Sequence, residues 1–280
     1  MKRLLITTSI VVSFIFLSGV GTGLTQNDDN LTISGSTTVL PIGQKAVEVF
    51  NKRHPNVKIS ISGTGSGDGI KALIDSTTNI AMSSREIKSS ETQQAAAKNV
   101  QPKEHIIAFD GIVPIVNPKN SITNITLAQL RDIYTGKITN WKDVGGTPGN
   151  IVVISRDSSS GTFEAWGELV LNKERVTPAA QLQASNGAVA ETVAKTPNAL
   201  GYVGIGYAEG NSSVKGLSVE GIKASADTVI NKTYKISRPL YMFTNGEPKG
   251  ATAQFIAFML SPEGQQVVKE EKFVPLPKKR

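Results

Sequence analysis

Glycine-rich loops that carry hydroxyl side chains occur three times in this 280-residue chain, each between an expected strand and an expected helix. They are Gly35-Ser36-Thr37-Thr38, Gly65-Ser66-Gly67 and Ser158-Ser159-Ser160-Gly161-Thr162. Such loops bind anions, because the first N–H groups of a helix lack intrahelical partners and lie at the positive end of its dipole. Serine and threonine are also ordinary helix caps and glycine an ordinary turn residue, so a single loop would indicate little. Three of them favour an anion site.

Two arginines stand beside serine-rich turns of this kind. Arg156 precedes the third loop, and Arg85 follows Ser84 at the end of an expected strand over 80–82. A guanidinium group stays charged and can bind two oxygens of a tetrahedral anion at once. We therefore expect both arginines in the site, although a salt bridge with Glu86 at the rim is an alternative for Arg85.

The elements that must position these residues alternate between strand and helix. Strands are expected at 31–34, 58–62, 80–82, 105–117, 151–154, 201–205 and 235–244, and helical patterns lie between most of them. The long apolar pattern over 105–117 is interrupted by Asp110-Gly111. This alternation predicts an α/β fold with mostly parallel sheets. Ligands of such sheets lie beyond the carboxyl ends of the strands, where the three loops are expected.

Composition excludes several kinds of site. The chain has no cysteine and only two histidines, His54 and His105, which argues against thiolate metal sites, cysteine nucleophiles and a Ser-His-Asp triad. The net charge is +7, or +5 without Lys2 and Arg3, but the basic residues are scattered among acids with few aromatic residues nearby. That pattern argues against nucleic-acid binding. The P-loop ending and the nucleophile elbow are both absent, and we expect no cofactor.

The N-terminus reads as a secretory leader. Lys2-Arg3 precedes an apolar run over 4–20, which is followed by small residues and then by polar ones. We expect residues 1–26 to be a signal peptide that is cleaved or, because the run approaches the length of a membrane span, retained as an anchor. The protein is therefore expected to work outside the cytoplasm, in the periplasm or at the cell surface.

The ordered set of motifs resembles the phosphate-binding proteins of ABC-type phosphate importers. The resemblance is carried by 34–41, 63–71 and 155–162, with Ala199-Leu-Gly-Tyr-Val-Gly204 and Ser261-Pro-Glu-Gly264 fitting the same pattern. It covers essentially everything after the leader. It implies a type II periplasmic-binding-protein fold, with two α/β lobes joined by two hinge crossings. On that pattern lobe 1 spans 27–112 and 210–280, and lobe 2 spans 113–209.

The same resemblance implies a function and a set of ligand residues. It implies a monomer without enzyme activity that binds inorganic phosphate and meets the membrane only through its leader or through the permease of an ABC permease and ATPase complex. The implied ligand residues are Thr37, Thr38, Ser66, Arg156, Ser160, Gly161 and Thr162.

Two positions depart from the family pattern. Ser158 stands where some relatives have an aspartate that buttresses the arginine, and Ser84, followed by Arg85, stands where many have an aspartate that accepts the proton of the ligand. Ser84, Arg85 and Ser158 are nevertheless expected among the residues that bind phosphate. We expect Asp110 to supply this acceptor instead. A buried carboxylate would favour phosphate, which keeps a proton near neutral pH, over sulfate, which has none. The alternative interpretation of Asp110-Gly111 is a β-bulge with a solvent-facing acid.

Two other classes of function stay open at this stage. A phosphohydrolase would also carry a phosphate site, but the lack of cysteine, the few histidines and the lack of clustered acids count against it. A receptor of the same fold that senses an oxyanion could be held at the membrane by an uncleaved leader.

Overall fold

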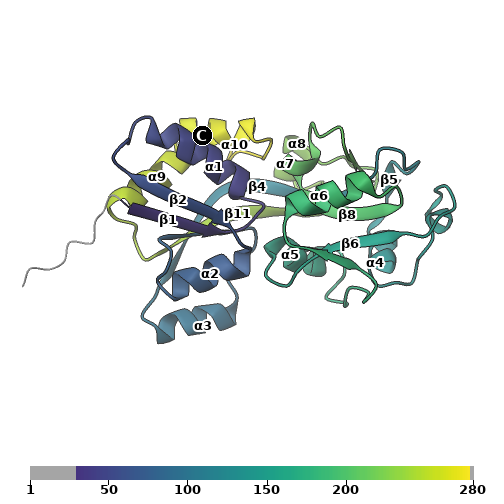
Figure 1. The fold of residues 1–280 in the computed structure, drawn as a ribbon, viewed down its shortest axis with the longest axis horizontal. Coiled ribbons are helices and arrows are strands. Elements are labelled where there is room, and N and C mark those ends of the chain that lie inside the picture. The colour runs from purple at the N-terminus through teal and green to yellow at the C-terminus, as the bar shows by residue number, and fades with distance from the viewer. Residues whose placement is uncertain (1–29, 278–280) are drawn as a thin grey trace, which may run out of the picture.

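The computed structural model describes residues 30–277. The expected leader at 1–26 lies outside these residues. Two α/β lobes lie side by side, and strands β4 (Pro102–Val116) and β11 (Ser237–Asn245) run between them (Figure 1). Within the described part of the chain, no helix has the length and apolar character needed to cross a membrane.

Lobe 1 is built from two separated parts of the chain. Its sheet has the order β2-β1-β3-β11-β4, in which β1 is parallel to β2 and β3 while β11 is antiparallel to both of its neighbours. Residues of the edge strand β2 alternate between exposed and partly buried, whereas every residue of the central strand β3 is buried because helices cover the sheet. The elements are β1 (Asn30–Gly35), α1 (Leu40–Asn51), β2 (Lys58–Gly63), α2 (Ser66–Ile74), β3 (Ile80–Ser83), α3 (Ser89–Ala97), β4 (Pro102–Val116), β11 (Ser237–Asn245), α9 (Gly250–Leu260) and α10 (Pro262–Glu270).

Lobe 2 is a smaller sheet with the order β4-β8-β6-β7. Its core includes Trp166, which stacks on Tyr202 with ring centroids 4.3 Å apart. The elements are β5 (Asn124–Ile125), α4 (Leu127–Tyr134), the 3₁₀ helix η1 (Trp141–Val144), β6 (Val152–Arg156), α5 (Gly161–Leu169), β7 (Gln181–Gln183), α6 (Asn186–Lys195), β8 (Ala199–Gly204), α7 (Ile205–Ala208), β9 (Lys215–Gly216), β10 (Ser218–Val219) and α8 (Ala226–Ile230).

Strand β4 belongs to both lobes. Its residues 102–111 pair with β11 and its residues 112–116 pair with β8. The strand expected over 105–117 is therefore confirmed, and it continues through Asp110-Gly111 although these residues interrupt its apolar pattern. The one shift in pairing lies a little earlier in β4, where Ile107 is the extra residue between Ile106 and Ala108, opposite Tyr241 and Leu240 of β11. The sheets are also mixed rather than mostly parallel, since the two crossing strands run antiparallel to their neighbours.

The segment after residue 210 packs on lobe 2. Strand β9 pairs with β4 at its lobe 2 end, and β10 pairs with β5. Val229 and Ile236 lie in the same core as Trp166. These contacts differ from the expected return to lobe 1 at residue 210, which followed the family outline rather than any local signal. We propose that lobe 2 extends to about residue 236 and that β11 is the second crossing.

Candidate functional site

The three glycine-rich loops meet where the lobes face each other, as expected. The Oγ1 atoms of Thr38 and Thr162 lie 2.9 Å apart, although the two residues are 124 positions apart in sequence. The Oγ atom of Ser66 accepts a hydrogen bond from the Ser84 N–H at 3.0 Å and lies 3.3 Å from the Ser84 Oγ. All four side chains are buried. The site therefore combines hydroxyls from both lobes.

Two glycines allow this close approach. A Cβ atom on Gly161 would lie 2.4 Å from the Oγ of Ser66, so no larger residue fits there without displacing the site. Gly65 has φ +117°, a backbone conformation that side chains disfavour, and a Cβ on it would lie 2.3 Å from the Oγ of Ser159. Gly67 donates its N–H to the carbonyl of Ser159 at 2.9 Å. The lobes are thus in direct backbone contact.

Arg156 ends strand β6 and is only 1% exposed. Its Nε donates to the carbonyl of Gln183 at 2.9 Å, and its Nη2 donates to the carbonyl of Ala184 at 3.0 Å. Its buried Nη1 has no hydrogen-bond partner among residues 30–277. Burial lowers the pKa of Arg156 and nearby Asp157 opposes this, but a guanidinium still remains charged. Arg156 therefore offers a fixed, charged donor for which residues 30–277 supply no acceptor.

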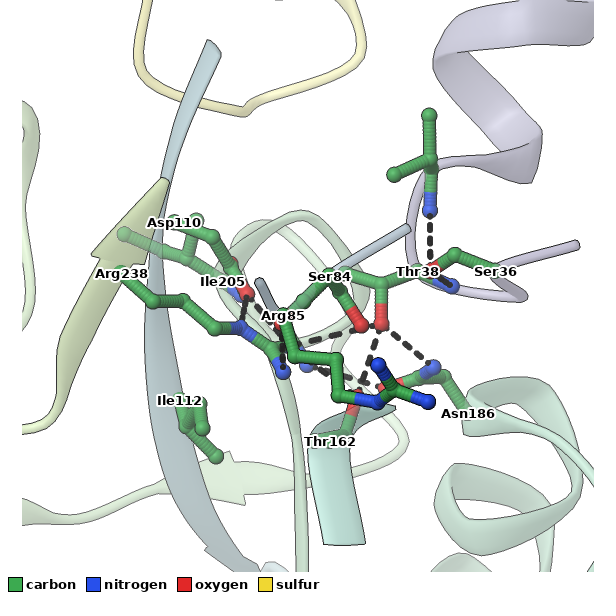
Figure 2. Close-up of polar contacts among 12 residues, drawn as sticks. Ser36, Thr38, Ser84, Arg85, Asp110, Ile112, Thr162, Asn186, Ile205 and Arg238 are labelled. Carbon is green, nitrogen blue, oxygen red and sulfur yellow. Dashed lines mark hydrogen bonds and ion pairs between the residues drawn. The ribbon is translucent and has the colours of Figure 1, made fainter. Parts of the chain in front are cut away.

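Asp110 lies in the part of β4 opposite Arg238 of β11 and is fully buried (Figure 2). Its Oδ2 accepts from the Nη2 and Nε of Arg238 at 2.8 and 3.0 Å, and its Oδ1 accepts the N–H of Ile205 at 2.9 Å. Burial raises the pKa of the Asp110 carboxyl, and Arg238 and the Ile205 N–H only partly offset it. The alternative of a solvent-facing acid at a bulge is wrong. Acceptance of a ligand proton by Asp110 stays a prediction.

Arg238 is a site residue that sequence reasoning missed. Besides Asp110, its guanidinium donates to the carbonyl of Ser84 at 3.0 Å and to the Oγ1 of Thr162 at 3.0 Å. It is 6% exposed. The signal in the sequence was an unmatched charge inside an apolar strand pattern on each of the two crossing strands, Asp110 in one and Arg238 in the other. Buried charges of this kind require a partner.

Asn186 is a second residue that was missed. It is the first residue of α6, after Ser185, whose Oγ caps the helix by accepting from the Ala188 N–H at 3.0 Å. Its Nδ2 donates to the Oγ1 atoms of Thr37 and Thr38, each at 3.0 Å. The run Ser185-Asn186-Gly187 lies between a strand and a helix, as the other three loops do, and could have been recognised as a fourth.

The side chain of Arg85 bonds to carboxylates rather than to this hydroxyl cluster. Its Nη1 and Nη2 donate to the carboxylate of Glu91 at 2.8 and 2.7 Å. Its Nε is 2.9 Å from the Oε2 of Glu164, a close ion pair without the alignment of a hydrogen bond. Glu86 interacts with this guanidinium through its backbone carbonyl and not through its side chain. The alternative of a side-chain salt bridge between Arg85 and Glu86 is therefore wrong. Because Glu164 is on α5, its ion pair with Arg85 joins the two lobes.

The remaining expected residues differ in their burial. Ser160 is 1% exposed, and its Oγ accepts the N–H of Phe163 as the cap of α5. Ser158 is exposed. The carboxylate near the arginine comes instead from Asp157, whose Oδ2 lies 3.6 Å from the Nη2 of Arg156. Asp157 therefore provides the carboxylate beside Arg156 that some relatives have at the position of Ser158.

The candidate site has more hydrogen-bond donors than acceptors. Buried Arg238 is paired with buried Asp110, whereas buried Arg156 has no hydrogen bond to a carboxylate among the described residues, and hydroxyls from both lobes lie in the same site. Such a set is suited to holding an anion away from water, because charged and neutral N–H and O–H donors together replace its hydration.

Comparisons with known proteins agree with this reading. A family model described as a PBP superfamily domain matches residues 20–263. The phosphate-binding protein PstS of Borreliella burgdorferi is 39% identical over 264 residues, which cover 89% of this chain and 92% of the relative. PstS of Bacillus subtilis is 30% identical, covering 88% of this chain and 81% of the relative.

Solved structures similar to this chain also come from phosphate transport proteins. A proposed phosphate ABC transporter substrate-binding protein from Clostridium perfringens, with phosphate bound, has a TM-score of 0.83 and 38% identity, covering 89% of this chain and all of that one. An ABC-type phosphate transport receptor from Vibrio cholerae has a TM-score of 0.72 and 34% identity, covering 88% of this chain and all of that one. The expected periplasmic-binding-protein fold is confirmed. This chain belongs to the PBP superfamily and, within it, to the family of the phosphate-binding proteins PstS.

Proposed function

We propose that the protein captures inorganic phosphate between its two lobes outside the cytoplasm and delivers it to an ABC importer. The observation that carries this proposal is the buried Nη1 of Arg156, which has no acceptor among residues 30–277 although the other two nitrogens of the guanidinium are held by backbone carbonyls. A buried charged donor left without an acceptor is costly, so a ligand oxygen is the natural partner. The relative with bound phosphate supports phosphate as that ligand.

The proposed site takes its groups from both lobes. Thr37, Thr38 and Ser66 would contribute from lobe 1, and Arg156 with Ser160, Gly161 and Thr162 from lobe 2. Asp110, on the crossing strand, would accept the proton of hydrogenphosphate through the lone pair of Oδ1 that the Ile205 N–H leaves free. Ser84 and Arg85 are proposed to act differently from the expectation: Ser84 by supporting Ser66, and Arg85 by joining the lobes.

The cellular role follows from the family. We propose that the chain is secreted through its N-terminal leader, acts as a monomer and passes phosphate to a permease and ATPase complex. Its relatives are named as a phosphate-binding protein and as an ABC-type phosphate transport receptor, which supports binding rather than catalysis. Incubation with a phosphomonoester should therefore release no phosphate, and measurable turnover would favour the phosphohydrolase instead.

The direct test is calorimetric titration of protein stripped of ligand by unfolding and refolding. We expect phosphate to bind and to raise the melting temperature, and sulfate to do neither at the same concentration. At a hundredfold excess over Kd, the free energy of unfolding should rise by roughly 2.7 kcal/mol. A melting temperature that millimolar phosphate leaves unchanged would contradict the proposal.

A further inference from the structure

We propose that Tyr207 is a positioning residue for phosphate binding, because its hydroxyl holds the first glycine-rich loop in place relative to Asp110. This inference rests on the proposed function. Tyr207 lies on the one-turn helix α7 and donates its hydroxyl proton to the backbone carbonyl of Thr37 at 2.6 Å, although the two residues are 170 positions apart in sequence. The direction of this bond is certain, because a carbonyl oxygen can only accept.

The bond acts on the peptide group between two candidate ligand residues. The carbonyl of Thr37 and the N–H of Thr38 belong to one planar unit, so a bond at one end constrains the orientation of the whole unit. At the other end, the Thr38 N–H donates to the Oγ of Ser36 at 3.1 Å. The peptide plane beside the Thr37 and Thr38 side chains is therefore held at both ends, by its own loop and by Tyr207.

Helix α7 also holds the carboxylate of the candidate site. The N–H of Ile205, the first residue of this helix, donates to the Oδ1 of Asp110 at 2.9 Å (Figure 2). Tyr207 follows only two residues later in the same helix. The spacing between Asp110 and the first loop is therefore set by a single turn of helix that bonds to both of them.

Close packing on the C-terminal segment fixes the position of this helix. A Cβ atom on Gly206 would lie 2.3 Å from the Cε2 of Phe273 and 2.7 Å from the carbonyl oxygen of Glu271, so the backbone of α7 lies directly against that segment. Phe273 is buried, and the ring of Tyr207 packs against the same hydrophobic core. A fixed ring on a fixed helix preorganises the first loop for a ligand, which lowers the cost of binding.

The hydroxyl of Tyr207 stays protonated beside the charges of the site. Burial raises its pKa, Arg156 lowers it, and Asp110 and Glu271 raise it further. The hydroxyl is therefore a donor at neutral pH. Because its one proton goes to the carbonyl of Thr37, Tyr207 has none to donate to the ligand and acts on it through the loop.

The test is Tyr207→Phe, which removes one oxygen atom and keeps the ring that packs in the core. Phosphate affinity is measured by calorimetry on the stripped full-length chain. We expect Kd to rise roughly 3- to 10-fold, because loss of one neutral hydrogen bond leaves the first loop less well fixed. An unchanged Kd would overturn the role of Tyr207, whereas a wild-type chain that binds no phosphate would refute the proposed function itself.

Tyr134→Phe is the matched control. Tyr134 is also a buried tyrosine, and its hydroxyl lies 3.0 and 3.3 Å from the backbone carbonyls of Ile154 and Leu200, both in the sheet of lobe 2. Its replacement should lower the melting temperature without changing Kd. If the two variants weaken phosphate binding equally, the loss of any buried tyrosine hydroxyl has this effect, and a specific role of Tyr207 is refuted.

A double-mutant cycle with Thr37→Val tests whether Tyr207 acts through the first loop. In the native background, Thr37→Val should raise Kd roughly 10- to 100-fold, because one donor to an anion is lost. In the Tyr207→Phe background, the same change should cost at least about threefold less, because the hydroxyl of Thr37 is no longer well placed. Equal costs in the two backgrounds would show that Tyr207 does not act through this loop and would overturn the inference.

Discussion

Replacement of Arg156 by lysine tests the part of the site on which the proposed function depends most. The change keeps the positive charge but removes the planar group that Gln183 and Ala184 hold in place through their carbonyls. The free Nη1 disappears with it. A flexible ammonium cannot both satisfy the two carbonyls and reach the ligand, so we expect weaker phosphate binding despite the conserved charge.

The magnitude follows from what Nη1 can donate. One hydrogen bond to a charged group contributes about 1.5–3 kcal/mol, so Kd should rise roughly 10- to 100-fold. At a phosphate concentration of a hundred times the wild-type Kd, binding stabilises the wild-type protein by roughly 2.7 kcal/mol. After a 100-fold loss of affinity, the same concentration stabilises the variant by only about 0.4 kcal/mol. The phosphate-dependent rise in melting temperature should shrink from roughly 5–10 °C to about 1 °C.

Calorimetry and thermal melts with and without phosphate measure both quantities. Arg131→Lys is the matched control, because Arg131 also donates its Nε to a backbone carbonyl, that of Val170, but lies outside the site. It should leave Kd unchanged. If Arg156→Lys binds phosphate as tightly as the wild-type protein, the unpartnered Nη1 does not face the ligand and the reasoning fails.

Three further predictions concern other groups. Asp110→Asn should shift the ratio of phosphate to sulfate affinity toward sulfate. It should also destabilise the fold by about 3–5 kcal/mol, because Arg238 loses its buried partner. An unchanged ratio in parallel titrations of the two anions would remove Asp110 from the site. Glu164→Gln should weaken phosphate binding by about fivefold and speed phosphate release in stopped-flow experiments, because the ion pair with Arg85 that joins the lobes is lost. Equal release rates in the two proteins would show that this ion pair does not favour closure of the lobes. Burial lowers the pKa of His105 below its ordinary 6.5, so the unfolded chain binds the proton more readily and the free energy of unfolding falls as the pH drops below about 6.5. His105→Gln should reduce this slope in urea melts at about pH 7.5 and about pH 5.5, and an identical slope would assign it to other groups.

Local sequence signals were enough to find the loops of the site and the α/β architecture. A single loop of glycine, serine and threonine between a strand and a helix could be an ordinary cap, but three of them follow strands β1, β2 and β6, whose ends meet where the lobes face each other. Ser160 and Ser261 cap helices through the hydroxyls that the pattern indicated. These features depend on residues within a few positions of each other.

What escaped prediction depends on pairing over long distances. Arg238 reaches Asp110 only because β11 inserts beside β4 with one particular register, and the two residues are 128 positions apart. The partners of Arg85 are similar: Glu164 approaches it from the other lobe, and nothing near Arg85 in the sequence indicates that contact. The short strands β9 and β10 are a further case, because their place is set by their partners β4 and β5 rather than by their own patterns.

The position of β11 has a consequence for the order in which the protein can fold. This strand comes from the last part of the chain, yet it lies in the interior of the lobe 1 sheet, between β3 and β4. Until it is available, β3 and β4 each present an unpaired edge, which is a template for aggregation. Lobe 2 forms from one continuous segment between the two crossings and can assemble first. We therefore expect lobe 1 to complete late and slowly, because its central pairings close a loop of more than a hundred residues. Truncation before residue 237 should then leave a chain in which lobe 2 folds but the incomplete sheet of lobe 1 causes aggregation.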